Sequence, residues 1–416
     1  MKISENEELT RVGPGTPAGE MLRRYWHPVG LSADLKDSPK AVKVLGENLV
    51  LFRKPDGSCG LLDSRCPHRG ANLAAGYIEE DGLRCPYHGW LFNASGKCLE
   101  QPCEPADSRL KDRIKQVSYP VEELGGLVFA YMGPAPRPQL PRYDILCATN
   151  GSRRAAFARY VPINWLQMVD NHQDPTHTTY LHRQIQPWQA TPECHYFNSA
   201  LGSIAVAARP DPQTATHYVR EVHFIVPNGM KVPISEPDES AFDKPSTQRM
   251  VWVVPMDDHQ SVEWEVLFAP FDAEGKPTHF KYDADPALYK IEPPKPFAEY
   301  VTPGANGYPD YEASGACGAT VILRQDTVIQ ASQGVIQPRE HEHLGTSDRG
   351  VILLRKILKE AIDAVARGDD PRGVVRDDQT EIIPVEVADE LVPESEYRGL
   401  LRLESLWAAQ GRVTAE

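Results

Sequence analysis

Two short segments of the chain each place one cysteine and one histidine close together. Cys66 and His68 are separated by one residue, and Cys85 and His88 by two. Thiolates and imidazoles are common ligands of transition metals, and such a spacing lets both side chains of a segment reach one centre. The four side chains therefore predict a metal centre that is shared between two arms of the chain.

The mixed composition of each arm favours an iron-sulfur cluster. In a [2Fe-2S] centre with two cysteines and two histidines, called a Rieske centre, the thiolates bind one iron and the imidazoles the other. Here Cys66 and Cys85 would bind one iron, and His68 and His88 the other. The alternative is a structural zinc site, but zinc fingers usually place two cysteines in one arm and two histidines in the other.

A second group of possible ligands lies in segment 164–182. Asp174 and His177 are three residues apart and share one face of a helix, whereas His177 and His182 would lie about 140° apart on a regular helix. For both histidines to bind one metal, the helix must unwind or bulge, and Pro175 also disfavours a regular helix there. The alternative interpretation is a solvated helix with polar side chains.

The cluster arms make a second metal site more plausible, because an electron-transfer centre needs an electron acceptor. Two histidines and one carboxylate form the ligand set of non-haem iron(II) enzymes that use oxygen. On both motifs, the chain resembles the large catalytic subunit of Rieske non-haem iron aromatic-ring-hydroxylating oxygenases, most of all their phthalate dioxygenase-like branch. The stretches 325–334 and 343–348 extend the resemblance.

The resemblance implies that His177, His182 and Asp326 bind a mononuclear Fe(II). For the carboxylate ligand, three nearby residues remain open as alternatives to Asp326, namely Glu340, Glu342 and Asp348. A further alternative is that Asp326 is an acid that stabilises the N-terminus of a helix.

Asp174 is implied to be a bridging acid, hydrogen-bonded to a histidine of the cluster and to a histidine of the mononuclear site. A carboxylate between two imidazoles fixes their tautomers and couples the two centres. In relatives an Asn or Glu stands close to Asp170 and Asn171, and the sequence does not say which of the two approaches the iron. His172 is expected to be exposed and not to be a ligand.

The resemblance also implies the partners. These are a small aromatic substrate, O2, and a separate NAD(P)H-dependent reductase that contains flavin and a [2Fe-2S] cluster. The chain has no glycine-rich dinucleotide fingerprint, which favours a separate reductase. The implied assembly is a homotrimer, or a dimer of trimers, in which the cluster of one chain supplies electrons to the mononuclear iron of the neighbouring chain.

Length and charge limit the number of domains and the kinds of partner that the chain can have. The 416 residues allow more than one domain, and the net charge of -14 disfavours nucleic acid or an anionic membrane as a partner. No apolar run is long enough to span a membrane and the N-terminus is charged, so we expect a cytoplasmic protein. The eight cysteines do not form a disulfide framework. A second sulfur-ligated site at Cys98 and Cys103 is not expected.

The pattern of residues predicts an α+β fold. We expect an N-terminal segment, 1–24, that packs on the catalytic domain, an antiparallel β Rieske domain over 25–140, and a larger catalytic domain over 141–416. The catalytic domain should have a central antiparallel sheet flanked by helices, in a helix-grip or START-like arrangement. Strands are predicted at 41–53, 126–131, 200–225 and 249–268, and helices at 164–181 and 351–367.

The predicted function is a terminal oxygenase that dihydroxylates an aromatic ring, with an aromatic carboxylate or a related aryl compound as substrate. An alternative is a Rieske monooxygenase that removes O- or N-methyl groups, and a distant one is an electron-transfer protein without oxygen chemistry. Arginines of the catalytic sheet could bind a carboxylate, but we expect them at the surface; they are Arg209, Arg220 and Arg249.

Overall fold

The computed structural model describes residues 1–182, 190–211, 214–234, 247–272, 274–276, 319–376 and 381–400. Cys317, one of the eight cysteines, lies outside these residues. Within the described part, three small sheets precede one large sheet along the chain. The expected α+β architecture, with an N-terminal β region and a larger region built on an antiparallel sheet, is confirmed.

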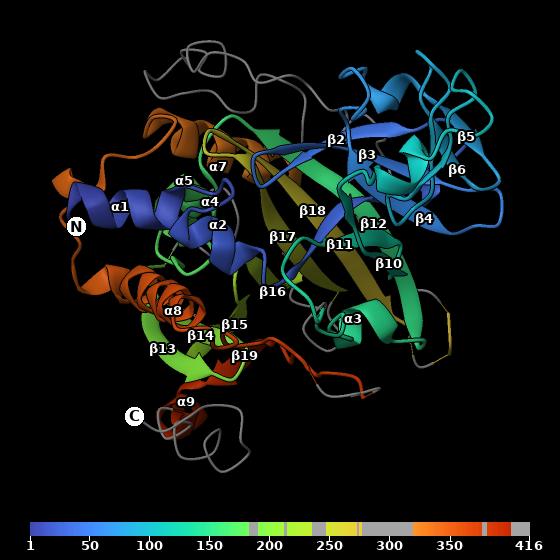
Figure 1. Cartoon of the computed structure of the whole chain (residues 1–416). Coiled ribbons are helices and arrows are strands. Elements are labelled where there is room, and N and C mark those ends of the chain that lie inside the picture. The colour runs from blue at the N-terminus through green and yellow to red at the C-terminus, as the bar shows by residue number, and fades with distance from the viewer. Residues whose placement is uncertain are drawn as a thin grey trace, which may run out of the picture.

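The large sheet has eight antiparallel strands (Figure 1). Its neighbouring strands β17 and β18 are buried along most of their length. The strands predicted at 200–225 and 249–268 are confirmed. In sheet order the strands are β12 (Gly151–Val161), β18 (Gln260–Pro270), β17 (Thr247–Asp257), β16 (Gly229–Ile234), β15 (Thr216–Ile225), β14 (Gly202–Asp211) and β13 (Glu193–Ser199), and β19 (Asp389–Pro393) pairs with β15.

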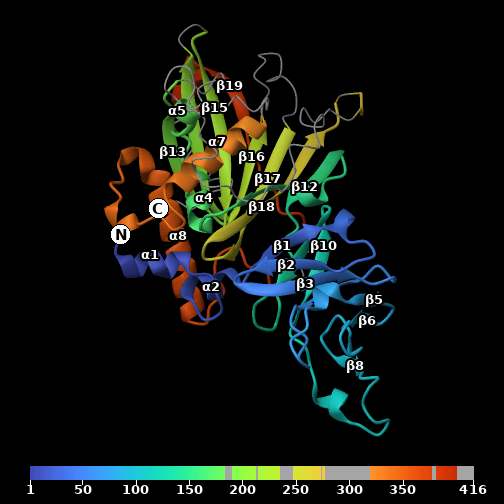
Figure 2. The ribbon, with the colours of Figure 1, turned by 90° about the horizontal axis from the view of Figure 1, so that it is seen from above.

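Helices gather on one side of this sheet (Figure 2). Helix α8 packs against α2, α4 and β14, so the N-terminal segment is fixed to the larger region. The predicted helix at 351–367 is confirmed, and Gly368 ends it with a φ of 85°. The helices are α1 (Ile3–Thr10), α2 (Pro17–Leu22), α3 (Asp144–Cys147), α4 (Trp165–Asn171), α5 (Thr178–Leu181), α7 (Ala319–Ser332), α8 (Arg349–Ala366) and α9 (Glu394–Leu400).

The single helix predicted over 164–181 is wrong in its middle. Helix α4 ends at Asn171 and α5 begins at Thr178, with a non-helical segment between them. Pro175 explains the break, because proline lacks the amide hydrogen that a helix interior needs and clashes with the preceding turn. The break provides the unwinding that two histidines five residues apart require if they are to face one metal.

Three small sheets form the N-terminal region, and the strands predicted at 41–53 and 126–131 belong to them. The first Cys/His arm follows β4, and the second lies between β6 and β7. The sheets consist of β1 (Trp26–Leu31), β11 (Leu127–Tyr131) and β10 (Val121–Leu124); of β2 (Lys40–Val44), β3 (Glu47–Arg53), β4 (Cys59–Asp63) and β9 (Ser118–Tyr119); and of β5 (Tyr77–Glu79), β6 (Gly82–Arg84), β7 (Leu91–Phe92) and β8 (Cys98–Glu100).

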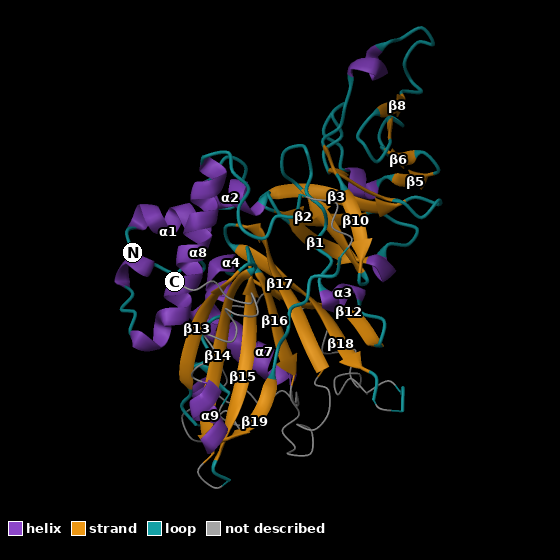
Figure 3. Ribbon diagram, turned by 90° about the horizontal axis from the view of Figure 1, so that it is seen from below, coloured by secondary structure: helices purple, strands orange, loops and turns teal. Residues whose placement is uncertain are grey.

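The two candidate metal regions lie at opposite ends of the molecule. The sheet formed by β5, β6, β7 and β8, which carries the second Cys/His arm, projects away from the large sheet (Figure 3). Helices α5 and α7 lie far from β5 and β6 in both Figure 1 and Figure 2. A single chain therefore holds the two candidate centres well apart.

Candidate metal centres

The two Cys/His arms adopt the same turn. The backbone amide of Gly70 donates to the carbonyl oxygen of Cys66 at 2.8 Å, and that of Gly89 donates to the carbonyl oxygen of Cys85 at 3.1 Å. The two glycines have φ values of 75° and 70°, a region that residues with a side chain rarely adopt. The glycine that ends each arm is therefore needed for the turn that directs the ligands.

The four side chains of the arms converge. Cys66 and Cys85 are each only 2% exposed and their thiols form a hydrogen bond, while the rings of His68 and His88 meet edge to face at 4.5 Å. Trp90 stacks on His68, with ring centroids 4.5 Å apart. Two buried thiols next to two partly exposed imidazoles fit the donor set of a Rieske cluster.

The surroundings of Cys66 also suit a bound cluster. Burial raises the pKa of the Cys66 thiol to about 11, although backbone amides of His68 and Arg69 donate to its sulfur and lower the pKa. Iron binds the thiolate, so a metal at this point would reverse the effect of burial. Amide donors to cluster sulfurs are among the groups that set the reduction potential of such a centre.

His177, His182 and Asp326 come together at the second site. Each offers one ligand atom, and these atoms all lie within 4.8 Å of one another. Nε2 of His182 is 3.2 Å and Nε2 of His177 is 3.7 Å from Oδ1 of Asp326. Two imidazole nitrogens and one carboxylate oxygen match the ligand set of non-haem iron(II) sites, which leaves coordination positions open.

Both imidazoles are held with Nε2 directed at the carboxylate. Nδ1 of His177 donates to the backbone carbonyl oxygen of Asp174, and Nδ1 of His182 lies 2.7 Å from Oε1 of Gln325. A carbonyl oxygen can only accept, so each Nδ1 carries the proton and each Nε2 keeps its lone pair. This tautomer is the one that can bind a metal through Nε2.

The charges of the group favour an ionised carboxylate between two imidazoles. Burial alone would raise the pKa of Asp326, but the imidazoles of His182 and His177 outweigh burial and lower it to about 2. Burial alone would lower the pKa of His177, but Asp174 and Asp326 raise it. Such mutual stabilisation is typical of a site that is preformed for a cation.

The structure does not favour the alternative roles and residues that were considered for Asp326. Asp326 lies in the middle of α7, so it is not an acid at a helix N-terminus. Glu342 forms an ion pair with Arg355 at 2.6 Å, and Asp348 accepts from the amide of Gly345 at 2.7 Å. Neither carboxylate belongs to the group around the two histidines.

Asp174 lies beside His177 and is accessible from outside. Its Oδ2 is 3.7 Å from Nδ1 of His177, and its Oδ1 accepts from the amide of Thr176 at 2.9 Å. The Asp174 side chain is 25% exposed. It can therefore meet a group of another molecule while it stays next to an imidazole of the mononuclear site.

A series of linked ion pairs on the large sheet fixes α7, the helix that carries Asp326. Arg159 of β12 donates through Nη1 to the carbonyl oxygen of Leu323 at 2.9 Å and to Oγ1 of Thr327 at 2.8 Å. Its Nε pairs with Glu263 at 2.8 Å, and Glu263 also pairs with Arg249 at 2.5 Å. These pairs are buried, so they fix the helix in one place and do not move freely as surface pairs do.

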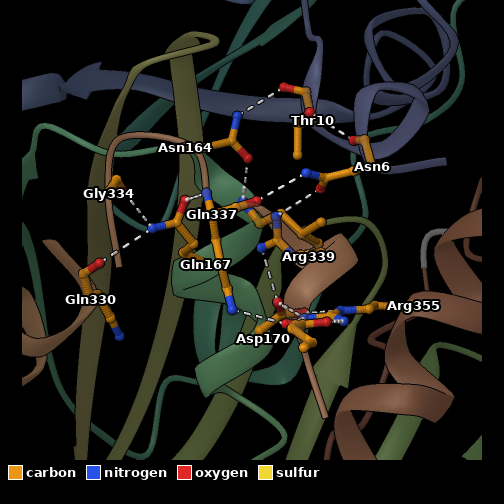
Figure 4. A network of polar contacts seen from close by, with 12 residues as sticks. Asn6, Thr10, Asn164, Gln167, Asp170, Gln330, Gly334, Gln337, Arg339 and Arg355 are labelled. Carbon is orange, nitrogen blue, oxygen red and sulfur yellow. Dashed lines mark hydrogen bonds and ion pairs between the residues drawn. The ribbon is translucent and has the colours of Figure 1, made fainter. Parts of the chain in front are cut away.

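Gln167 ties the helix before the histidines to the end of α7 (Figure 4). Its Nε2 donates to the carbonyl oxygens of Gln330 at 3.2 Å and Gly334 at 2.9 Å, and its Oε1 accepts from the amide of Gln337 at 3.0 Å. Nothing in the sequence pattern signalled this residue. It holds together two segments, far apart in the chain, that carry the candidate ligands.

Of Asp170 and Asn171, it is Asn171 that approaches the site. Its Nδ2 lies 3.4 Å from Oδ1 of Asp326. Asp170 points the other way, where its carboxylate accepts from Arg339 at 3.1 Å and from Arg355 at 2.6 Å (Figure 4). Asp170 therefore fixes helix α4, and Asn171 is the polar neighbour of the candidate ligands.

The expectation that His172 is exposed is wrong. Its Nδ1 is buried, with no hydrogen-bond partner in the part of the chain that the structure describes. Burial, together with the positive charges of Arg159 and Arg249, lowers the pKa of His172 to about 4, although Glu263 and Asp326 raise it. His172 caps the C-terminus of α4 and lies close enough to Glu263 of the sheet and to Asp326 for their charges to act on it.

The three candidate arginines are not at the surface either. Arg209 is 2% exposed, and the side chains of Arg220 and Arg249 are each 15% exposed. The sequence did not show that these arginines are buried. Polar and apolar residues alternate only partly along the strands, so the pattern does not reveal which face is covered. Arg249 is occupied by two glutamates, Glu263 and Glu265.

Comparisons with known proteins show the family to which the chain belongs. A family model described as Rieske [2Fe-2S] domain matches residues 25–120. The 5,5'-dehydrodivanillate O-demethylase oxygenase subunit of Sphingobium sp. is 34% identical over 91% of this chain and 84% of its own length. The phenoxybenzoate dioxygenase subunit alpha of Ectopseudomonas oleovorans is 37% identical over 88% of this chain and 87% of its own.

The chain belongs to the Rieske non-haem iron oxygenases. The solved structure of NdmA from Pseudomonas putida CBB5 supports the fold, with a TM-score of 0.62 at 20% identity over 88% of this chain and all of that one. Family membership excludes the zinc interpretation of the Cys/His arms.

A Rieske oxygenase subunit carries a [2Fe-2S] cluster and a mononuclear iron, and it works with a reductase on a small molecule and O2. The predicted class of enzyme is confirmed. In the described residues, no helix is long and apolar enough to cross a membrane.

Proposed function

We propose that this chain is a terminal oxygenase whose mononuclear iron is bound by His177, His182 and Asp326. The observation that carries the proposal is the convergence of three ligand atoms within 4.8 Å, with both histidines held as the metal-binding tautomer. The bound iron would supply a site for oxygen activation. The residues of the chain hold the imidazoles, keep Asp326 ionised and place Asn171 beside it.

The cluster in this proposal is bound by Cys66 and Cys85 on one iron and by His68 and His88 on the other. The support is the repeated turn of the two arms and the meeting of their side chains. Replacement of Cys85 by serine should abolish the cluster absorption while the mononuclear site still binds iron. Retention of the full spectrum by Cys85→Ser would show that the assignment is wrong.

Electron delivery is proposed to pass between chains. The cluster arms and helix α5 lie at opposite ends of one chain, which disfavours a route within it (Figures 1 and 2). In a head-to-tail homotrimer, or in a dimer of trimers, the cluster of one chain would face the partly exposed Asp174 of the next. A reductase with flavin and a [2Fe-2S] cluster would take electrons from NAD(P)H and pass them to the Rieske cluster.

The substrate is proposed to be an aromatic carboxylate or a related aryl compound that undergoes ring dihydroxylation. Arg209 supports this choice, because it is buried and its Nη2 donates to the carbonyl oxygen of Pro175 at 2.8 Å and to Thr178, the neighbour of His177, at 2.7 Å. Its Nε and Nη1 have no hydrogen-bond partner within the described residues. Two free donors of a guanidinium match a carboxylate.

The competing reaction is oxidative demethylation, which the similarity to an O-demethylase subunit favours. The two reactions are separated by a substrate screen with a surrogate reductase and isotopically labelled O2. Dihydroxylation places both oxygen atoms in one product, whereas demethylation releases formaldehyde and leaves a phenol or amine. Formation of neither a doubly labelled product nor formaldehyde from any aromatic substrate would contradict both.

The role of Arg209 can be tested in the same screen. Arg209→Gln should raise KM for a carboxylate substrate on the order of a hundredfold and leave KM for its uncharged amide or ester nearly unchanged. An equal effect on the charged and the uncharged compound would show that Arg209 does not bind the carboxylate.

A further inference from the structure

Gln325 makes a direct contact with a candidate iron ligand. It precedes Asp326 in α7 and is 4% exposed, and its Oε1 lies 2.7 Å from Nδ1 of His182, which is 1% exposed. The hydrogen bond joins residues 143 positions apart in the chain. We propose that Gln325 is a positioning residue that sets the tautomer and orientation of His182 at the mononuclear site. This inference rests on the proposed assignment of His182 as an iron ligand.

The contact leaves His182 only one arrangement that can bind a metal. If the amide oxygen of Gln325 faces Nδ1, the neutral imidazole carries its proton there and keeps the lone pair on Nε2. If the amide were turned so that its nitrogen faced Nδ1, the proton would lie on Nε2 and block the metal. Binding of iron through Nε2 of His182 therefore requires Gln325 to keep its amide oxygen toward Nδ1.

The two histidines of the site are held by different kinds of acceptor. Nδ1 of His177 lies next to Asp174, which has a carboxylate as well as the accepting carbonyl. Nδ1 of His182 meets a neutral amide. Because a charged acceptor makes an imidazole a stronger donor to its metal, His182 should be the weaker electron donor of the pair.

The same hydrogen bond connects the segments that carry the ligands. His182 follows α5, whereas Gln325 and Asp326 lie on α7. Rotation of α7 that moved Asp326 away from the iron would also break the contact with His182. Gln325 thus links the position of the carboxylate to that of the imidazole at the site itself.

Helix α7 also provides a matched control. Gln330 is of the same residue type and is likewise 4% exposed, but both its side-chain amide atoms lack a hydrogen-bond partner among the described residues. Gln330→Leu therefore removes a buried amide from the same helix without removing a bond to a ligand. Any general effect of such a replacement on α7 appears in this variant too.

The test measures how tightly the mononuclear site holds Fe(II) in the full-length protein, by competition with a chelator while the cluster absorption is monitored. Gln325→Leu should weaken Fe(II) binding about ten- to hundredfold relative to Gln330→Leu. Gln325→Glu, which keeps an oxygen acceptor, should retain Fe(II) at least as tightly as the unmodified protein. It should also shift the iron(III)/iron(II) potential to a lower value.

The glutamate variant separates positioning from packing. If Gln325 only filled space, a buried negative charge would be more damaging than leucine, so Gln325→Glu would bind Fe(II) less well than Gln325→Leu. That order, or equal binding in Gln325→Leu and Gln330→Leu, would overturn the inference. His182→Ala identifies the other kind of failure, because full Fe(II) binding in that variant would contradict the proposed site itself.

Discussion

At the scale of single residues, the account depends on which nitrogen of each histidine carries a proton. Nδ1 of His177 faces a backbone carbonyl oxygen and Nδ1 of His182 faces the amide oxygen of Gln325, so that both Nε2 atoms point toward Asp326. A histidine on a solvated helix, the alternative reading of this segment, would have no such constraint. The pattern of bonds is that of a site prepared for a cation before the cation binds.

Asp174 gives a prediction at this scale. Asp174→Asn should leave the cluster and the mononuclear iron largely bound, because the backbone carbonyl that holds His177 is unchanged. Product formation should nearly vanish, since the amide cannot replace a carboxylate between two imidazoles. Iron content, the cluster spectrum and turnover are measured together. Intact turnover would show that Asp174 does not bridge the centres.

His27 predicts a dependence of stability on pH. It is fully buried, its Nε2 donates to the carbonyl oxygen of Leu22 at 2.8 Å, and burial, aided by Arg23, lowers its pKa to about 4. The unfolded chain takes up a proton near pH 6.5 and the folded chain only near pH 4. Stability from neutral His27 is therefore complete above pH 6.5 and falls as the pH drops toward 4, by about 2 kcal/mol at pH 5.

Urea unfolding at pH 7 and pH 5 checks this prediction. His27→Gln should lose less stability between the two pH values than the unmodified protein does. His341→Gln is the control, because the His341 side chain is 80% exposed and should not change the dependence. If His27→Gln lost as much stability between pH 7 and pH 5 as the unmodified protein, His27 would not be the cause of the pH dependence.

At the scale of elements, the site depends on helix α4, which ends at Asn171, and on helix α7, which Arg159 and Gln167 hold in place. The sequence predicted the motif 174–182 and the need for an unwound helix, because periodicity and Pro175 are local signals. It did not predict Gln167, Arg159 or Gln325, whose partners lie more than a hundred residues away. Such partners have no spacing that a single sequence can reveal. The burial of Arg209 was missed because polar and apolar residues alternate only partly along its strand.

Asp170 gives the prediction at this scale. Asp170→Leu would leave two buried guanidinium groups, of Arg339 and Arg355, without this carboxylate, and should lower the free energy of unfolding by about 3 kcal/mol. The control is Asp369→Leu, because its pair with Arg367 is 63% exposed on both sides. Thermal midpoints measure the difference. Equal midpoints would mean that Asp170 does not fix α4.

At the scale of the whole molecule, the separation of the two centres predicts complementation between chains. Cys85→Ser lacks the cluster and His182→Ala lacks the mononuclear iron, so neither should form product alone. When the two are co-expressed, a chain with intact iron can lie next to a chain with an intact cluster, and activity should partly return. A mixed assembly with no activity would contradict electron transfer between chains.

The iron content of purified variants shows whether one chain carries two separate metal centres. We expect about three irons per chain in the unmodified protein, about two in His182→Ala and about one in Cys85→Ser. The cluster absorption should survive only in the first two. Two irons per unmodified chain, both lost in Cys85→Ser and both kept in His182→Ala, would instead describe an electron carrier and would contradict the account.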